Sequence, residues 1–376
     1  MRSYKGSTKI RFMENIVIKI GSSVLTVDNG SPDHNRFKEI CNDVSHIIDE
    51  GYMVVLVSSG AIAYGRAIAG NKLKSLSLPE KQVLSSIGQP MLIHTYMTNF
   101  KPHNKIVSQI LLTHEDFLDR TRYLNARRSI ELMLKHGFIP IINENDAIAV
   151  DEIKVGDNDT LSAMVSVMVN AERLIILSNI DAIYDRDPNR YKDAKPVKEI
   201  MDIGQYHITD EGKSKYGVGG IKTKIEAARL LSRLGIYTTI ADGRVKNIIT
   251  RLMNGEKLGT TVLPSSKKIE AKRKWISLLM KSSGSIVIDN GAVSAVLKKK
   301  SLLAAGIVSV SGAFKQGEVV SIMDTGANQI GKGITNYSVT DIEKIKGKKS
   351  LQINSSLGYK KGDEIIHRDN LVIIEE

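Results

Sequence analysis

The sequence predicts an α/β protein with a mainly parallel central sheet, followed by a small β-rich domain. Up to about residue 264, short apolar runs rich in β-branched residues alternate with amphipathic helical stretches. Small and polar residues follow each of these runs, and beyond residue 283 short strands recur with turn signals between them. Alternating strands and helices are typical of βαβ units, whose helices cover both faces of a parallel sheet.

The elements of the first part follow in a regular order. The apolar run at 16–21 predicts a strand, 33–50 an amphipathic helix, and 53–60 a second strand that leads into further helix. The remaining strands are expected at 105–112, 138–146, 173–181 and 236–243, and the remaining helices at 123–136, 158–172 and 221–235.

The C-terminal part has shorter elements. Strands are expected at 285–289, 306–312, 317–324, 334–339 and 371–376, with a helix near 293–300. The turn signal Asp289-Asn290-Gly291 is typical of a small β-rich fold.

Composition and charge suggest the domain organisation. We expect a basic extension at 1–13, a domain at 14–264, a lysine-rich linker at 265–282 and a β-rich domain with its tail at 283–376. Most of the net charge of +12 lies in the extension and the linker. The basic balance alone is therefore a weak argument for nucleic-acid binding.

Several classes of protein are excluded. A single cysteine rules out an intrachain disulfide and a cysteine-based zinc cluster, and it fits a reducing, cytoplasmic compartment. No run of 18 apolar residues predicts a membrane span. Neither a Walker loop nor a G-x-G-x-x-G loop is present.

Lys19 lies inside the first apolar strand, directly before Gly21-Ser22-Ser23. A lysine within a strand is costly unless its ammonium group meets an anion, and small residues let the backbone approach phosphate oxygens. The alternative is a solvent-facing edge position.

Ser59 and Gly60 end the second strand and open a helix, where a carboxylate or phosphate can bind. The alternative is tight packing between strand and helix.

The densest polar segment runs from Asn143 to Asp159. Asp157 or Asn158 could cap the helix expected near Thr160, and Asp157 with Asp159 could hold a metal. So many polar side chains between an apolar strand and an apolar helix favour a polar ligand.

A glycine-rich loop precedes a helix that carries Lys222 and Lys224. Glycines expose N–H groups and a lysine supplies mobile charge, which indicates a phosphate cradle; the alternative is a flexible loop beside a solvated helix face. Two lysines, this loop and a carboxylate cluster at one rim of the sheet fit phosphoryl transfer.

Six segments resemble the amino-acid kinase superfamily in order, over residues 14–264. They are IVIKIGSSVLT, VVLVSSGAIAYG, YLNARRSI, IPIINENDAIAVDEIKVGDNDTLSA, NIDAIYDRDP and GGIKTKIEAA. SLLAAGIVSVSGAFKQGEVVSI and the late HRDN resemble the PUA domain appended to many members. The resemblance implies a three-layer αβα sandwich with a mainly parallel sheet, plus a C-terminal PUA domain.

The resemblance also implies transfer of the ATP γ-phosphate to the side-chain carboxylate of L-glutamate, the first step of proline biosynthesis. Lys19 and Lys224 would stabilise the transferring group, and Asp159 would hold both lysines. Glutamate would contact Ser59, Gly60, Asp146, Asp157 and Asn158. ATP would contact Lys19, Ser178, Asn179, Val218, Gly219, Gly220, Ile221, Lys222, Thr223 and Lys224.

The implied partners are ATP as cosubstrate, with Mg²⁺ bound mainly through its phosphates, and L-proline as a feedback ligand. A homodimer or homotetramer is expected. Asn179, Val218 and Ile221 depart from residues frequent in the family. The alternatives are a sister kinase acting on another carboxylate and RNA binding through the PUA domain. The three aromatic residues of that region, Phe314, Tyr337 and Tyr359, are few for base stacking.

Overall fold

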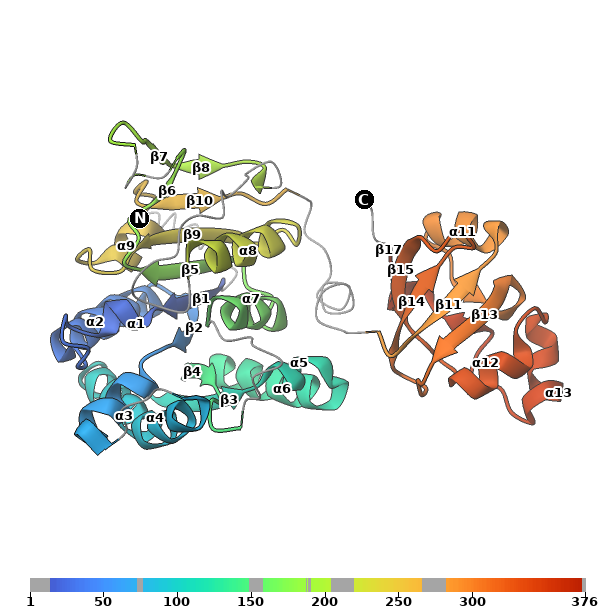
Figure 1. Ribbon diagram of the computed structural model, residues 1–376, viewed down its shortest axis with the longest axis horizontal. Coiled ribbons are helices and arrows are strands. Elements are labelled where there is room, and N and C mark those ends of the chain that lie inside the picture. Colours follow the sequence, from blue (N-terminus) through green and yellow to red (C-terminus); the bar gives the residue numbers. More distant parts are fainter. Residues whose placement is uncertain are drawn as a thin grey trace, which may run out of the picture. The chain divides into compact units, whose positions relative to one another are not determined.

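A computed structural model describes residues 14–72, 77–148, 158–186, 188, 191–203, 220–265 and 282–373. The described residues form two compact units (Figure 1). The first lies within Met1–His114 and Ala126–Lys267, and the second within Glu115–Asn125 and Lys268–Glu376. Among these residues, no helix has the length and apolar character needed to cross a membrane.

The first unit is built on an eight-stranded sheet in the order β3-β4-β2-β1-β5-β9-β10-β8. The six strands from β3 to β9 are parallel, and β10 runs antiparallel to β9. The strands are β1 Asn15–Ile20, β2 Met53–Ser58, β3 Val107–Leu112, β4 Ile139–Glu144, β5 Arg173–Ser178, β8 Glu199–Ile200, β9 Tyr237–Asp242 and β10 Thr260–Val262. A separate ribbon pairs β6 Ile183–Tyr184 with β7 Pro196–Val197.

Helices cover both faces of this sheet, as the sequence predicted (Figure 1). The helices within residues 14–265 are α1 Ser22–Leu25, α2 His34–Asp49, α3 Ala61–Ala69, α4 Leu78–Phe100, α5 His114–Leu118, α6 Arg120–Lys135, α7 Asn158–Met168, α8 Ile221–Ser232 and α9 Ile248–Met253, with 3₁₀ turns at Gly70–Lys72 and Lys101–His103. Side chains of α2, α4 and α9 share one buried core with β1, β2 and β5. Helices α7 and α8 lie on the opposite face.

The central strands are apolar because both of their faces are covered. In β1 and β2 every residue after the first is buried, including Lys19 in β1. Parallel strands covered on both faces read as nearly continuous Val, Ile and Leu runs. Since these strands are parallel, their carboxyl ends meet at one edge, which is where ligands bind in open α/β sheets.

The second unit contains a five-stranded sheet in the order β13-β11-β14-β15-β17. Its strands are β11 Gly284–Ile288, β13 Ile307–Gly312, β14 Val319–Met323, β15 Gln329–Ile334 and β17 Leu371–Ile373, with β12 Leu302–Leu303 paired to β16 Glu364–Ile366. The helices are α11 Asn290–Leu297, α12 Val339–Ile345 and α13 Ile353–Leu357, with 3₁₀ turns at Ala304–Gly306, Ser350–Gln352 and Arg368–Asn370. The predicted β-rich character is confirmed.

The strand predicted at 334–339 was wrong. The chain leaves β15 at Ile334, and Ser338 caps helix α12 by accepting a hydrogen bond from the Asp341 N–H. The real strand was missed because Gly331 and Gly333 weaken its strand signal. A Cβ at Gly331 would lie 2.4 Å from the Val372 carbonyl oxygen, so the close approach of β17 requires glycine there.

Candidate active site

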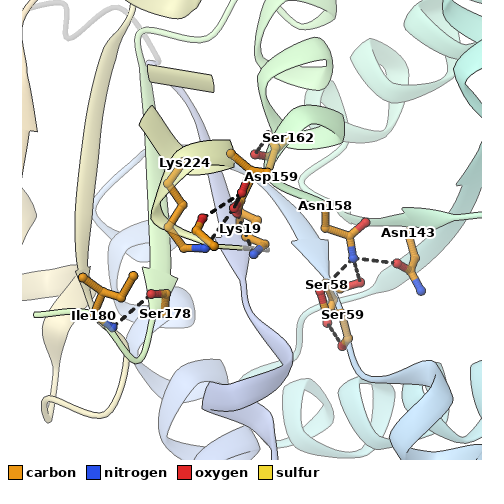
Figure 2. Close-up of polar contacts among 12 residues, drawn as sticks. Lys19, Ser58, Ser59, Asn143, Asn158, Asp159, Ser162, Ser178, Ile180 and Lys224 are labelled. Atoms are coloured by element: carbon orange, nitrogen blue, oxygen red, sulfur yellow. Dashed lines mark hydrogen bonds and ion pairs between the residues drawn. The ribbon is translucent and has the colours of Figure 1, made fainter. Parts of the chain in front are cut away.

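Polar side chains gather at the carboxyl ends of β1, β2, β4 and β5 and at the first turn of α7 (Figure 2). They form two groups. Lys19, Asp159 and Lys224 make the first, and Ser58, Ser59, Asn143 and Asn158 make the second.

In the first group, two lysines hold one carboxylate. Lys19 Nζ lies 2.6 Å from Asp159 Oδ1, and Lys224 Nζ lies 2.9 Å from Asp159 Oδ2. The lysines come from β1 and α8, and Asp159 from α7. The exposed fractions are 4% for Lys19, 0% for Asp159 and 3% for Lys224, so Lys19 does not occupy a solvent-facing edge position.

This buried cluster joins two lysines to one carboxylate. Burial raises the pKa of Asp159, but the charges and hydrogen bonds of Lys19 and Lys224 outweigh burial, so its pKa lies below the ordinary value. The carboxylate therefore stays ionised at neutral pH. Two lysine ammonium groups gathered at the rim by one carboxylate suit a bound anion beside them.

Two residues keep the ammonium groups in position and accessible. Thr223 Oγ1 lies 3.0 Å from Asp159 Oδ2 and 2.9 Å from the Gly220 carbonyl oxygen, which ties the first turn of α8 to α7. A Cβ at Gly21 would lie 3.7 Å from Lys19 Nζ and 3.2 Å from the Leu177 carbonyl oxygen. Glycine at this position leaves room beside the ammonium group.

The second group centres on the Asn158 side-chain amide. Asn158 Nδ2 donates to Ser59 Oγ at 2.8 Å and to Asn143 Oδ1 at 3.0 Å, and it lies 3.3 Å from the Ser58 carbonyl oxygen. Asn158 is the first residue of α7, and its side chain points to β2 and β4 (Figure 2). Of the two residues predicted to cap this helix, Asn158 lies within its first turn, and Asp157 lies outside the described residues.

Gly60 and Asp146 lie at neighbouring strand ends. Gly60 precedes α3 with φ of 115°, a left-handed conformation that glycine adopts readily. Asp146 follows β4, and its Oδ2 accepts a hydrogen bond of 2.8 Å from Ser85 Oγ on α4. Burial raises the pKa of Asp146 more than the Ser85 hydrogen bond lowers it.

Apart from Lys19 in β1, the residues predicted to contact ATP lie in two segments. Ser178 ends β5, and its Oγ accepts from the Ile180 N–H at 3.0 Å; the Asn179 carbonyl oxygen lies 3.4 Å from Arg244 Nη2. Gly220 precedes α8, which begins at Ile221 and presents Lys222 to solvent. Three predicted site residues, Asp157, Val218 and Gly219, lie outside the described residues.

Three polar residues at this rim were missed from the sequence. Ser85 and Gln89 on α4 contact Asp146 and Asn143, and Tyr96 of the same helix shares a 2.8 Å hydrogen bond with Ser58 Oγ. Ser85 and Gln89 are four residues apart and therefore share one helix face, which was the available signal.

The described residues contain no group of three or more His, Cys, Asp or Glu side chains that could hold a metal ion. Both Asp159 oxygens already contact ammonium groups. The carboxylate is therefore better suited to holding the lysines than to ligating a cation.

Comparison with known proteins gives matches over nearly the whole chain. The amino acid kinase family matches residues 14–242, and the PUA domain matches residues 284–357. A glutamate 5-kinase from Thermoanaerobacter sp. (strain X514) is 44% identical over 96% of this chain and 98% of that protein. One from Dehalococcoides mccartyi (strain CBDB1) is 42% identical over the same shares. Among solved structures, carbamate kinase from Giardia lamblia matches with a TM-score of 0.49 and 17% identity, over 67% of this chain and 98% of that chain.

Proposed function

The chain belongs to the amino acid kinase family, and we infer that it transfers the γ-phosphoryl group of ATP to the side-chain carboxylate of L-glutamate. The products are L-glutamyl 5-phosphate and ADP, and the reaction is the first step of proline biosynthesis. Curated glutamate 5-kinases at 42–44% identity over nearly the whole chain support this substrate.

The observation that carries the reaction type is the buried pair of lysines on Asp159. A glutamate carboxylate oxygen attacks the γ-phosphorus, the bond from phosphorus to the bridging oxygen of the β-phosphate breaks, and ADP leaves with that electron pair. Negative charge spreads over the transferred group during this step. Lys19 and Lys224, held in place beforehand by Asp159, stabilise that charge without having to reorganise.

We assign glutamate to the Asn158 side of the rim and ATP to the Ser178 side. Glutamate contacts Ser59, Gly60, Asp146, Asp157 and Asn158 in this proposal. ATP contacts Lys19, Ser178, Asn179 and the segment 218–224. The support is that the lysine cluster lies between β5 and the Asn158 amide, where a phosphoryl group must pass from one ligand to the other (Figure 2).

Mg²⁺ neutralises phosphate charge when it is bound, and we propose that ATP carries it mainly through its own oxygens. The support is that Asp159 already contacts two ammonium groups. We further propose a cytoplasmic homodimer or homotetramer that L-proline inhibits. The domain boundaries at 14–264 and 283–376 stay predictions. The alternative of RNA binding by the PUA domain is not favoured by the glutamate 5-kinase relatives.

One assay tests the proposed function directly. Purified protein is incubated with ATP, Mg²⁺ and L-glutamate in the presence of hydroxylamine, which converts an acyl phosphate into a hydroxamate. We expect γ-glutamyl hydroxamate and one equivalent of ADP, both of which require L-glutamate. Hydroxamate formed with aspartate but not with glutamate would overturn the substrate assignment.

A further inference from the structure

Helix α4 presents two buried polar residues to the rim. Ser85 and Gln89 are one turn apart and only 4% and 8% exposed. Ser85 Oγ donates to Asp146 Oδ2 at 2.8 Å, and Gln89 Oε1 accepts from Asn143 Nδ2 at 2.9 Å. The same helix face therefore contacts two residues at the end of β4, one of which is assigned to the substrate.

The contact of Gln89 extends into a chain of three side-chain amides. Asn158 Nδ2 donates to Asn143 Oδ1, and Asn143 Nδ2 donates to Gln89 Oε1, so all three amides point the same way. Rotating the Asn143 amide would replace both hydrogen bonds by donor–donor and acceptor–acceptor contacts. The Ser58 carbonyl oxygen, which can only accept, holds Asn158 Nδ2 at 3.3 Å, and Gln89 supports the matching orientation of Asn143 from the other end of the chain.

This orientation determines which Asn158 atom is left for a ligand. Its Nδ2 already has acceptors at Ser58, Ser59 and Asn143. Its Oδ1 is buried and has no hydrogen-bond partner within the described part of the chain. A buried acceptor without a partner costs free energy, so a ligand that brings a donor to Oδ1 gains affinity.

Helix α4 cannot easily shift to change these contacts. A Cβ at Gly88 would lie 1.8 Å from the Ala61 carbonyl oxygen, and a Cβ at Gly65 would lie 1.8 Å from the Leu84 carbonyl oxygen. The backbones of α3 and α4 therefore touch on both sides of Ser85. Since α3 starts directly after Gly60, α4 is held against the end of β2.

We propose that Ser85 and Gln89 are positioning residues that adapt the site to an unacylated α-amino acid. The proposal rests on the proposed function. Ser85 orients the Asp146 carboxylate, and Gln89, through Asn143, supports the orientation in which Asn158 Oδ1 is left for the ligand. A carboxylate and an amide oxygen together suit an α-ammonium group, which offers positive charge and three donors. The α-nitrogen of an N-acylated amino acid carries no positive charge and offers only one hydrogen-bond donor.

Steady-state kinetics of the full-length enzyme test the role of Gln89. Gln89→Met keeps the length of the side chain but removes the amide. We expect the KM for L-glutamate to rise about tenfold, with the KM for ATP and kcat changed by less than about threefold. Gln352→Met makes the same chemical change at an exposed position of the second unit and should leave all three within about twofold.

A double-mutant cycle separates positioning from a merely structural effect. If Gln89 acts through Asn143, Gln89→Met should raise the KM for L-glutamate by less than about twofold in an Asn143→Ala background. Effects that multiply independently would overturn the proposal, as would an unchanged KM in the single variant. If the wild type itself forms no γ-glutamyl hydroxamate, the proposed function is wrong. If the wild type is active and the two effects multiply independently, only the role of Gln89 is wrong.

The hydrogen bond between Ser85 and Asp146 allows a second test in case Gln89→Met does not fold. Ser85→Ala should raise the KM for L-glutamate about three- to tenfold, and Ser85→Thr, which keeps the hydroxyl group, should restore it. Ser86→Ala alters an exposed neighbour and is the matched control. A Ser85→Ala enzyme whose KM for L-glutamate equals that of the wild type would reject the role of Ser85.

Discussion

Asn158 and Asp159 are neighbours in the sequence, yet their side chains enter different groups of the rim (Figure 2). Asn158 Nδ2 lies 2.8 Å from Ser59 Oγ, whereas Asp159 Oδ1 lies 2.6 Å from Lys19 Nζ. Successive helical residues point about 100° apart, so the first turn of α7 separates the two directions. The first turn of α7 therefore connects the proposed glutamate site to the two lysines.

Lys224→Ala should reduce kcat far more than it weakens glutamate binding. The lysine is proposed to stabilise charge that appears only during transfer, so its removal should lower kcat by about 10²–10³-fold with little change in the KM for L-glutamate. Hydroxamate formation over a range of glutamate concentrations measures both constants. Lys135→Ala, on the exposed side of α6, is the matched control, and an unchanged kcat in Lys224→Ala would reject the role.

Asp159→Asn should destabilise the fold because it leaves Lys19 and Lys224 buried without their common counter-charge. Removing one partner of a buried ionic cluster costs about 3–5 kcal/mol. Urea unfolding followed by circular dichroism measures the change. The exposed ion pair of Arg251 and Glu256 provides the contrast, since Glu256→Gln should barely move the midpoint. Equal midpoints for both variants would contradict a buried role for Asp159.

Asp146→Asn should stabilise the protein at neutral pH and weaken glutamate binding at the same time. The pKa of Asp146 is raised in the folded state, chiefly by burial, so its contribution to stability is full below the ordinary carboxyl value of about 4 and is lost as pH rises through the folded pKa. Asparagine cannot ionise and avoids that loss. The free energy of unfolding should therefore exceed that of the wild type at pH 7, and the difference should vanish below about pH 4. The prediction is contradicted if the free energy of unfolding of the variant, minus that of the wild type, is smaller at pH 7 than at pH 4.

Gly88→Ala should weaken the contact between α3 and α4. The added methyl group would lie 1.8 Å from the Ala61 carbonyl oxygen, which forces the two helices apart. Overpacking of this kind costs about 1–3 kcal/mol, and we also expect a higher KM for L-glutamate because Ser85 and Gln89 move with α4. Thermal melting measures the first effect and hydroxamate kinetics the second. The control is Ser86→Ala on the exposed side of the same helix, which should leave both values near those of the wild type.

Much of the first unit could be predicted because its signals are local. The strand containing Lys19 and the strand ending at Ser58 are recognisable as apolar runs followed by small residues, and parallel strands bring such ends to one edge. The strand at Gln329–Ile334 was missed because its glycines are required by the close approach of a neighbouring strand about forty residues away in the sequence. No local pattern reports that neighbour.

The sequence by itself determined the order of strands and helices and the chemistry at the strand ends. Periodicity and residue type are properties of a short stretch of chain, so they can be read without a fold. Only the tertiary structure decided that Lys19 and Lys224 meet opposite oxygens of Asp159, and that Gln89 accepts a hydrogen bond from Asn143. These contacts join residues that are 54, 65 and 140 positions apart in the chain, and packing of α4, α7 and α8 against the sheet sets them.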